Sequence, residues 1–446
     1  MMDVRTTQAL PPPAVAHCAT LASVDNAQIP SLEAQPLQPK PVAGWISWRL
    51  IGPGLLVCLA DTDAGCLIVA AQSGARWGYS LLMLQIILIP VLFLTQELTV
   101  RLGVHSGEGH TACIRRHFGA GWAWFACILL VFECICAMMS EMSGVAAVGE
   151  MFGFGRTSAT ITAAMIVATV VLCCNYRQIE VIGVTLGLFE LVFVVTMFCF
   201  HPSPMEVFVG SLNFHSDAEY IKLVAANIGA VIMPWMIYFQ QSAVVARHLT
   251  TPAQLAEERA NTLVGSILTQ LVMIGTLVTL AASPNKKDSD LDTVQDIAHA
   301  MSPVLGEQGA RILVSLGFVG GSLCAAFVVS LAAAWAVCEA AQWDVAPSLH
   351  EGPTKAPHFY LCFLSVVGIG IAVLLTGINI VTLNVLVELL DGLLLPFAAG
   401  FLFFLATGDA LPPDVRVCGW HKHLLAAVFT ICTMLSVSTA IYGLVA

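Results

Sequence analysis

The stretch LLVCLADTDAGCLIV, residues 55–69, places two carboxylates between two apolar runs. A carboxylate near the centre of a bilayer costs about 2.5–3.5 kcal/mol even on a lenient insertion scale, so Asp61 and Asp63 need compensation, which a bound cation supplies. On a regular helix the two residues would point about 200° apart, so both can face one ligand only where the backbone is unwound. Unwinding at Gly65 would also free backbone carbonyls, such as that of Ala60, as oxygen ligands. The stretch therefore predicts a membrane helix that is broken in its middle.

A second interruption occurs in the stretch NIGAVIMPWMI, residues 227–237. Pro234 removes a backbone donor and clashes with the preceding turn, so carbonyl groups near Ala230 are freed. Beside Pro234, the thioether of Met233 would add a soft ligand to these hard oxygens. Interrupted helices in corresponding positions of two halves indicate a transporter built from inverted repeats, with its site near the bilayer midplane. For either break alone, a tolerated kink is the alternative explanation.

The composition of the chain excludes several classes of protein. Of its 446 residues, 58% are hydrophobic and only 11% are charged, whereas soluble domains carry about 25% charged residues. Eighteen Lys and Arg against 29 Asp and Glu give a net charge of −11, the wrong sign for a nucleic-acid partner. The apolar runs are continuous and do not alternate, which excludes a transmembrane β-barrel. A chain of this composition belongs in a lipid bilayer.

The apolar pattern predicts an all-α integral membrane domain over residues 46–446, with about eleven transmembrane helices. The first 45 residues are polar and Pro-rich, lack a signal-peptide pattern and are expected to form a disordered cytosolic tail. Five-helix repeats would cover about 46–200 and 221–407, with an extra helix at 421–445. The predicted spans are 46–75, 78–102, 121–150, 157–175, 178–200, 221–247, 261–283, 308–343, 357–377, 380–407 and 421–445.

Lys and Arg residues on alternate loops predict the orientation. With the N-terminus in the cytosol and the C-terminus outside, twelve basic residues face inward and six face outward, as the positive-inside rule expects. The chain shows no Cys/His zinc spacing, no catalytic Ser/His/Asp set and no phosphate-binding loop, so we expect neither an enzyme nor a cofactor. Histidines such as His110 fall in loops or at helix ends, where they are most often solvated.

Four further carboxylates interrupt apolar segments. Glu388 and Asp391 stand at i and i+3, on one face of the tenth segment. Glu133 and Glu141 lie eight residues apart in the third segment and could form a proton or ion path. A polar helix end that faces water would also explain the first pair, and hydrogen bonds to a neighbouring helix would explain the second.

Simpler explanations also remain for the residues at the breaks. An ion pair with Arg49 or Arg76 near a helix end would account for Asp61 or Asp63. Met233 is one of fifteen methionines, most of which must fill gaps in the core.

Together these motifs resemble the Nramp family of divalent-metal transporters, which has the LeuT fold. Gly52-Pro53-Gly54 begins eleven residues before Asp63, and the runs QSGA at 72–75 and WGY at 77–79 follow with the family's spacing. In this register the family's Asp-Pro-Gly-Asn metal motif falls on residues 63–66. Its Met-Pro-His motif falls on residues 233–235.

The resemblance also implies which residues form the site. The family's tenth-helix Gln falls on Glu388, and an Arg follows the sixth-helix motif at Arg247. The expected principal ligands of a divalent metal are the Asp63 carboxylate, the Met233 thioether and the carbonyls of Ala60 and Ala230. Further candidates are Cys66, Glu388 and Asp61, and the candidate proton or ion path comprises Glu133, Glu141, Trp235 and Arg247.

Departures from the family pattern bear on coupling and selectivity. Ala64 and Cys66 replace the Pro and Asn of the first motif, and Trp235 replaces the His of the second. The acidic pair of helix three falls on Glu141 and Gly144, so one acid is missing. These losses predict weak or absent proton coupling, and they resemble the Nramp-related branch that includes magnesium transporters.

The sequence thus predicts a secondary transporter of divalent cations, of the manganese and iron type and with broad selectivity. A magnesium transporter is the alternative within the same branch. An amino-acid or organic-cation carrier of this fold would need a neutral or singly charged cavity. A sensor or simple channel would not require paired helix breaks.

Overall fold

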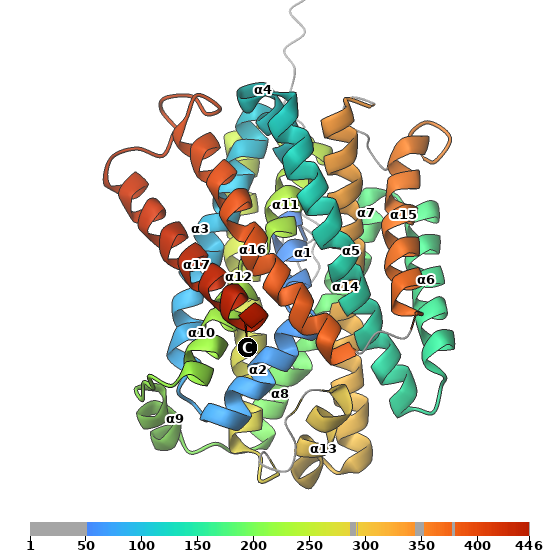
Figure 1. Cartoon of the computed structure of the whole chain (residues 1–446), viewed down its shortest axis with the longest axis vertical. Helices are drawn as coiled ribbons and strands as arrows, with labels where there is room; N and C mark the ends of the chain where they lie inside the picture. The colour runs from blue at the N-terminus through green and yellow to red at the C-terminus, as the bar shows by residue number, and fades with distance from the viewer. Residues whose placement is uncertain (1–50, 286–290, 292, 344–351, 377–379, 446) are drawn as a thin grey trace, which may run out of the picture. The chain divides into compact units, whose positions relative to one another are not determined.

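The computed structural model describes residues 51–285, 291, 293–343, 352–376 and 380–445, except for the side chains of 380–386, 388, 389 and 439–445. The predicted disordered tail, residues 1–45, lies outside the described residues. All regular elements in the described part of the chain are helices (Figure 1). They are α1 Pro53–Ala60, α2 Ala64–Trp77, α3 Leu82–Ser106, α4 His110–Phe118, α5 Ala120–Met151, α6 Arg156–Cys173, α7 Tyr176–Gly187, the 3₁₀ helix η2 Leu188–Leu191, α8 Val192–Cys199, α9 Pro204–Ser211, α10 Ala218–Gly229, α11 Pro234–Ala246, α12 Pro252–Ala282, α13 Val294–Leu305, α14 Glu307–Ala341, α15 Pro357–Leu374, α16 Ile380–Thr407 and α17 Gly419–Val445.

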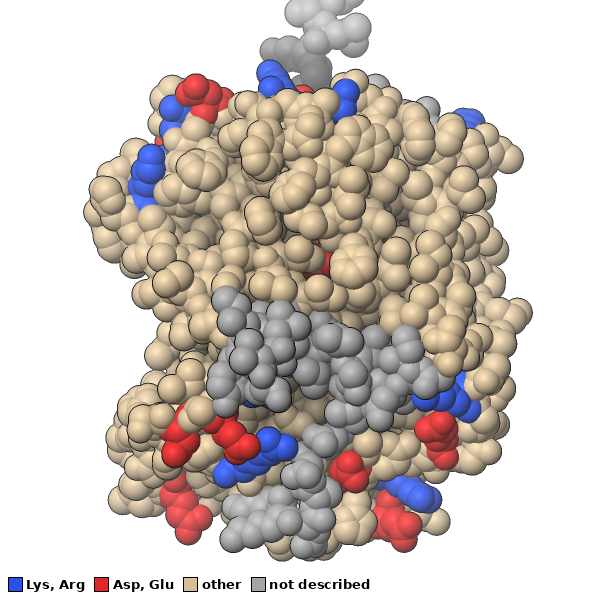
Figure 2. All heavy atoms as spheres, viewed as in Figure 1, with Lys and Arg blue, Asp and Glu red and all other residues tan. Residues whose placement is uncertain are grey.

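Membrane-spanning helices make up most of the fold. Among the described residues, ten helices are long and apolar enough to cross a bilayer, or eleven if the bent pair α1 and α2 counts as one span. Figure 2 shows Lys, Arg, Asp and Glu gathered mostly toward the two ends of the face in view, with a broad band of other residues between them. The predicted fold class, an all-helical multi-pass membrane protein, is confirmed.

Both predicted helix breaks are present. α1 begins at Pro53, whose fixed φ suits the first helical position, and ends at Ala60. α2 then starts at an angle of 55° to α1, with Asp63 as its N-cap. α10 ends at Gly229, and α11 begins at Pro234 after an extended Met233 with φ −86° and ψ 138°. The residue before a proline is pushed out of the helical region, so Met233 cannot continue the helix.

Some helix boundaries differ from the prediction. The seventh span begins at Pro252, nine residues before the predicted 261, because Thr251 and Gln254 form a capping box around a polar first turn. The short helices α4, α9 and α13 lie between the spans. They carry too few apolar residues in a row to register as membrane segments.

The first break is held against two neighbouring elements. α7, η2 and α8 together form one membrane span, which packs against both α1 and α14. A β-carbon added at Gly187 would come within 2.7 Å of the Leu59 β-carbon. This close approach holds α7 beside the end of α1.

Candidate metal site

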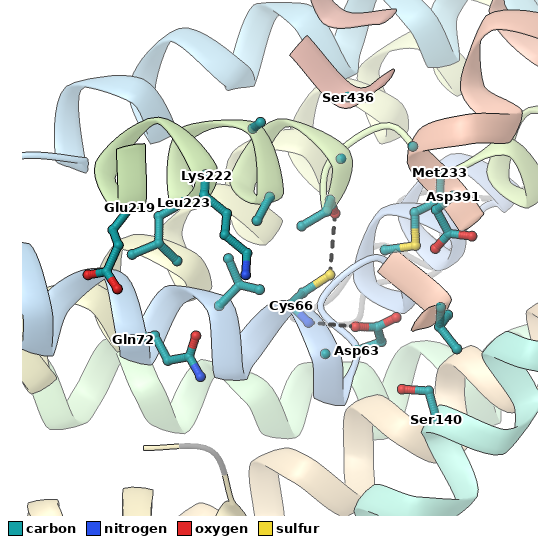
Figure 3. A pocket seen from close by; sticks show the side chains of 18 of the residues that line it. Asp63, Cys66, Gln72, Ser140, Glu219, Lys222, Leu223, Met233, Asp391 and Ser436 are labelled. Carbon is teal, nitrogen blue, oxygen red and sulfur yellow. Dashed lines mark hydrogen bonds between the residues drawn. The ribbon is translucent and has the colours of Figure 1, made fainter. Parts of the chain in front are cut away.

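A cavity of about 160 Å³ lies where the two helix breaks meet. Its walls come from α2 and α10, from the Ala230–Met233 interruption, and from residues of α5, α16 and α17 (Figure 3). Of the predicted ligands, Asp63, Cys66, Ala230 and Met233 all line it.

Asp63 is placed by its role at the start of α2. Its Oδ1 accepts a hydrogen bond of 2.8 Å from the backbone N–H of Cys66, as an N-cap does. The side chain is only 8% exposed, and the N-terminal end of α2 favours its negative charge. The break therefore presents a fixed carboxylate to the cavity.

Cys66 connects the two breaks. Its Sγ donates to the carbonyl oxygen of Ala230 at 3.3 Å, across from the first interruption to the second (Figure 3). A carbonyl oxygen has two lone pairs, so Ala230 can hold this thiol and still face a cation. Met233 adds a thioether to the same cavity. Carboxylate, carbonyl and sulfur are thus presented to one space.

Asp391 of α16 also lines the cavity, although the ligands predicted from the sequence do not include it. Its side chain is 7% exposed, and its Oδ1 has no hydrogen-bond partner in the part of the chain that the structure describes. The sequence signal was present, because Glu388 and Asp391 share one helix face, but the resemblance favoured Glu388. The side chain of Glu388 lies outside the described residues.

Two predicted ligands lie away from the cavity walls. Asp61 and Ala60 are buried at the end of α1 and do not line the cavity. Within the described ranges, neither carboxylate oxygen of Asp61 has a hydrogen-bond partner.

The residues of the predicted proton or ion path do not form one continuous group. Glu141 is fully buried and lies beside Asp63. Glu133 accepts a bond of 3.2 Å from the backbone N–H of Trp235. Arg247 lies elsewhere, at the start of α1, where its guanidinium donates to the Ile51 carbonyl at 3.3 Å.

Charged side chains near the outer part of the cavity have mixed signs. Glu219 and Lys222 of α10 and Arg76 of α2 line it together with the buried Asp63 and Asp391. Figure 3 shows Lys222 extending from α10 toward α2. The buried end of the cavity is acidic, and its basic groups are confined to α2 and α10.

The described residues do not form a closed cage of metal-binding side chains. Within the part of the chain that the structure describes, no three His, Cys, Asp or Glu side chains lie close enough together to hold a metal ion. A cation in this cavity would therefore use carboxylates, a carbonyl and the thioether, together with water. A ligand set of this kind suits reversible binding of the ion.

Sequence reasoning missed one functional candidate and misjudged another residue. Glu190 of η2 is fully buried, and its Oε2 accepts from the Thr62 hydroxyl at the first break. It is a lone carboxylate inside an apolar run, which is the same signal that identified Asp61. His110 was expected to be solvated but is fully buried, with Nδ1 2.7 Å from Gln241 Oε1, because α4 packs against α11.

Comparison with known proteins gives consistent matches over most of the chain. Residues 54–442 match the family described as natural resistance-associated macrophage protein-like, Nramp. The divalent metal cation transporter MntH of Ralstonia nicotianae is 26% identical over 330 residues, covering 68% of this chain and 74% of the relative. The protein of the same name from Brucella suis is 24% identical over 399 residues, covering 86% of both chains.

A solved structure shows the fold. The crystal structure of the Eremococcus coleocola manganese transporter, in complex with an aromatic bis-isothiourea substituted compound, superposes with a TM-score of 0.76 at 16% identity. The match covers 91% of this chain and 90% of that one. The resemblance drawn from the two helix breaks is thereby confirmed, and the chain belongs to the Nramp family.

Proposed function

We propose that this protein transports divalent metal cations across a membrane by alternating access, and that the ion binds in the cavity between the two helix breaks. The observation that carries the proposal is the meeting of Asp63, Met233 and the Ala230 carbonyl around one cavity of about 160 Å³. Interrupted helices that supply a carboxylate and unwound carbonyls near the midplane are the way such transporters hold ions.

The relatives support this proposal. The matched proteins from Ralstonia and Brucella are named divalent metal cation transporters, and the matched structure is that of a manganese transporter. These names agree with the expectation that the protein is not an enzyme.

The cavity also suggests a conformational state. It is lined by α2 and α10, which lie in the lower half of Figure 1, whereas α1 and α11 lie in the upper half. With the N-terminus in the cytosol, as the distribution of Lys and Arg predicts, the cavity faces the outer side. The protein would then be poised to receive an ion from outside.

Uptake of radioactive Mn²⁺ into proteoliposomes tests the site. Asp63→Ala removes the one carboxylate that is fixed by the α2 N-terminus, so we expect uptake to fall to background while the protein elutes as a single folded species. Asp217→Ala is the matched control, because Asp217 is exposed and its side chain makes no cap hydrogen bond. Uptake at the wild-type rate in Asp63→Ala would exclude the site.

Selectivity depends on whether the sulfur of Met233 is a ligand. Thioether sulfur favours Mn²⁺ and softer ions over Mg²⁺, whereas the carboxylates suit all of them. We infer broad selectivity with Mn²⁺ carried and magnesium as the alternative substrate. The deciding measurement is Mn²⁺ uptake under millimolar Mg²⁺ in wild type and Met233→Ala. If the preference for Mn²⁺ is the same in both proteins, magnesium transport replaces our proposal.

We expect proton coupling to be weak or absent. Trp235 offers no titratable group where the family has His, and Gly144 offers none where it has an acid. The buried Glu133 and Glu141 leave one residual route. Acidification of the proteoliposome lumen in proportion to Mn²⁺ flux would contradict this expectation.

A further inference from the structure

A second group of oxygens lies at the first helix break but does not line the cavity. Glu190 and Asp61 are 0% and 1% exposed. Neither residue lines the cavity. The Glu190 carboxylate interacts electrostatically with Asp63 and, after it, with Asp61, so the end of α1 holds two buried carboxylates in addition to the one that lines the cavity.

Close packing fixes this geometry. Glu190 Oε2 accepts from the hydroxyl of Thr62, at the centre of the break. A β-carbon added to Gly321 of α14 would collide with both Glu190 Oε1 and the Thr62 carbonyl oxygen. These two oxygens therefore lie side by side against α14, in space that only a glycine at position 321 leaves open.

Most of these oxygens have no donor. Both carboxylate oxygens of Asp61 and Oε1 of Glu190 are buried without a hydrogen-bond partner among the described residues. Among the described residues, no Lys, Arg or His forms an ion pair with Asp61 or Glu190. A buried carboxylate without a partner is strongly disfavoured, so two such groups at the same helix break need either protons or a cation.

The chemistry of the ligands favours a hard cation. Every atom in the group is an oxygen, and two carboxylates and a carbonyl are ligands that alkali and alkaline-earth ions prefer. The sulfur of Met233 belongs to the cavity. The two sites therefore differ in the ions they suit.

We propose that Asp61, Glu190 and the Thr62 carbonyl hold a second, oxygen-ligated cation, an alkali or alkaline-earth ion, at the junction of α1 and α2. This cation is distinct from the transported metal. It neutralises the carboxylates at the break and ties α1 and α2 to η2.

Thermal unfolding of the purified full-length protein in detergent tests the proposal. A ligand that binds only the folded state raises the melting temperature as its concentration increases. Na⁺, Mg²⁺ and Ca²⁺ chlorides are titrated separately against N-methyl-D-glucamine chloride, at constant ionic strength and pH. At least one of these ions should raise the melting temperature in a saturable manner, both in wild type and in Asp63→Ala.

Variants at the second site separate cation binding from a structural role. Glu190→Gln and Asp61→Asn should each raise the half-saturating concentration of that ion at least tenfold, whatever their own melting temperatures. Gly321→Ala keeps both carboxylates but fills the space beside them, so it should have the same effect. Glu97→Gln, which changes a buried carboxylate that pairs with Arg101 and Arg259 outside both sites, is the matched control and should leave the ion dependence unchanged.

Two outcomes would overturn the proposal. If no ion stabilises wild type while acidification does, the carboxylates share protons and hold no cation. If stabilisation disappears in Asp63→Ala but persists in Glu190→Gln, the ions bind only in the cavity. Because these measurements do not use Mn²⁺ uptake, they can fail while the proposed transport function stands, and the reverse is equally possible.

Discussion

The two halves of each broken helix differ in how tightly they are packed. In α1 all eight residues are buried, and in α11 twelve of thirteen are. In α10 only five of twelve residues are buried, and in α2 nine of fourteen. We call α1 and α11 the packed halves, and α2 and α10 the cavity halves. Each broken helix therefore contributes one half to a closed end of the protein and one half to an accessible end.

Polar contacts add to the packing at the closed end. Arg177 and Arg247 both donate to the Ile51 carbonyl, at 2.7 and 3.3 Å, just before α1 begins. Both guanidinium groups also pair with the buried Glu180. From α12, Glu258 accepts from the Gly54 N–H at 2.5 Å. We call these contacts the Glu180 network, and together they fix the start of α1.

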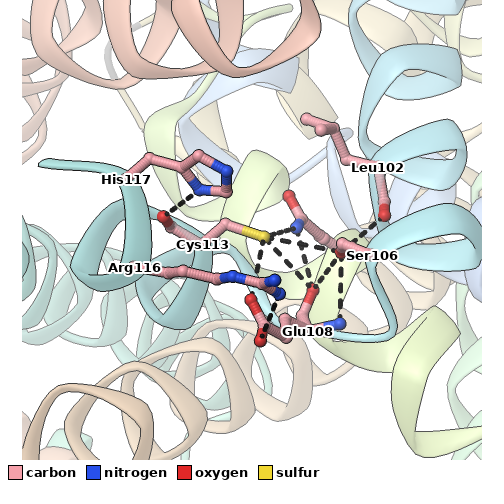
Figure 4. Close-up of polar contacts among 7 residues, drawn as sticks. Leu102, Ser106, Glu108, Cys113, Arg116 and His117 are labelled. Carbon is pink, nitrogen blue, oxygen red and sulfur yellow. Dashed lines mark hydrogen bonds and ion pairs between the residues drawn. The ribbon is translucent and has the colours of Figure 1, made fainter. Parts of the chain in front are cut away.

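The end of α11 is fixed in a similar way. Ser242 donates to Glu339 of α14 at 2.6 Å, and Gln241 donates to the Glu108 carbonyl at 2.9 Å. Figure 4 shows the surrounding cluster, in which Arg116 pairs with Glu108 at 3.1 Å. Burial lowers the pKa of the adjacent His110 to about 4, so this histidine contacts Gln241 as a neutral ring at pH 7.

The difference indicates which contacts have to break during transport. Alternating access exchanges the open and closed ends around a fixed site. The cavity halves are already accessible, so the next step has to release the packed halves. The contacts that hold the closed end are charged and lie at helix ends, where a change of state can exchange them for water.

Two native cysteines allow a direct test of this comparison. Cys58 of α1 is 0% exposed and lies away from the cavity, whereas Cys66 of α2 is 3% exposed but lines the cavity. A small thiol reagent should therefore modify Cys66 about 100-fold faster than Cys58. An opening free energy of about 3 kcal/mol for the packed half slows the reaction of Cys58 by that factor. Peptide mapping by mass spectrometry separates these two from the other cysteines. Equal rates would show that the packed half opens as readily as the cavity half.

Much of this comparison could be predicted from the sequence. Asp61 and Asp63 within an apolar run, and Met233 before Pro234, each gave a break at the correct place, because proline and intramembrane charge act locally. What the sequence could not give is the side of the break on which each carboxylate lies. Asp63 faces the cavity and Asp61 does not, since that depends on how α12 and α14 pack around the end of α1.

Asp391 was not among the predicted ligands for a related reason. Two acids at i and i+3 share one face of a helix, so the local pattern does not say whether Asp391 lines the cavity. Glu190 was missed because its importance comes from Thr62, 128 positions away in the chain. Such contacts are set by close packing at Gly187 and Gly321, which no local pattern records.

Weakening the Glu180 network should shift the balance between the two ends. Glu180→Gln leaves Arg177 and Arg247 without their shared carboxylate. If the free energy that stabilises the closed end falls by about 1.4 kcal/mol, the ratio of the open to the closed state of that end rises tenfold. Cys58 should then react about tenfold faster than in wild type. Glu307→Gln, which removes an exposed pair with Arg311 at 3.9 Å, should leave the rate unchanged. An unaltered Cys58 rate in Glu180→Gln would mean that apolar packing alone closes this end.

The smallest effect concerns the charges on the cavity halves. Lys222 is exposed and lines the cavity on the same helix as Glu219. Its positive charge should repel an arriving divalent cation, and exposed charge interactions of this kind are worth about 0.2–1 kcal/mol. Lys222→Gln should therefore lower the half-saturating Mn²⁺ concentration by about threefold at low salt. Glu219→Gln should raise it by a similar factor, and Lys355→Gln, at an exposed position outside the cavity, should do neither.

Both shifts in the half-saturating Mn²⁺ concentration should shrink as salt increases, because exposed charges are screened. If Lys222→Gln instead weakens Mn²⁺ binding, the lysine helps to hold α10 in place, and the cavity halves are more ordered than their exposure indicates.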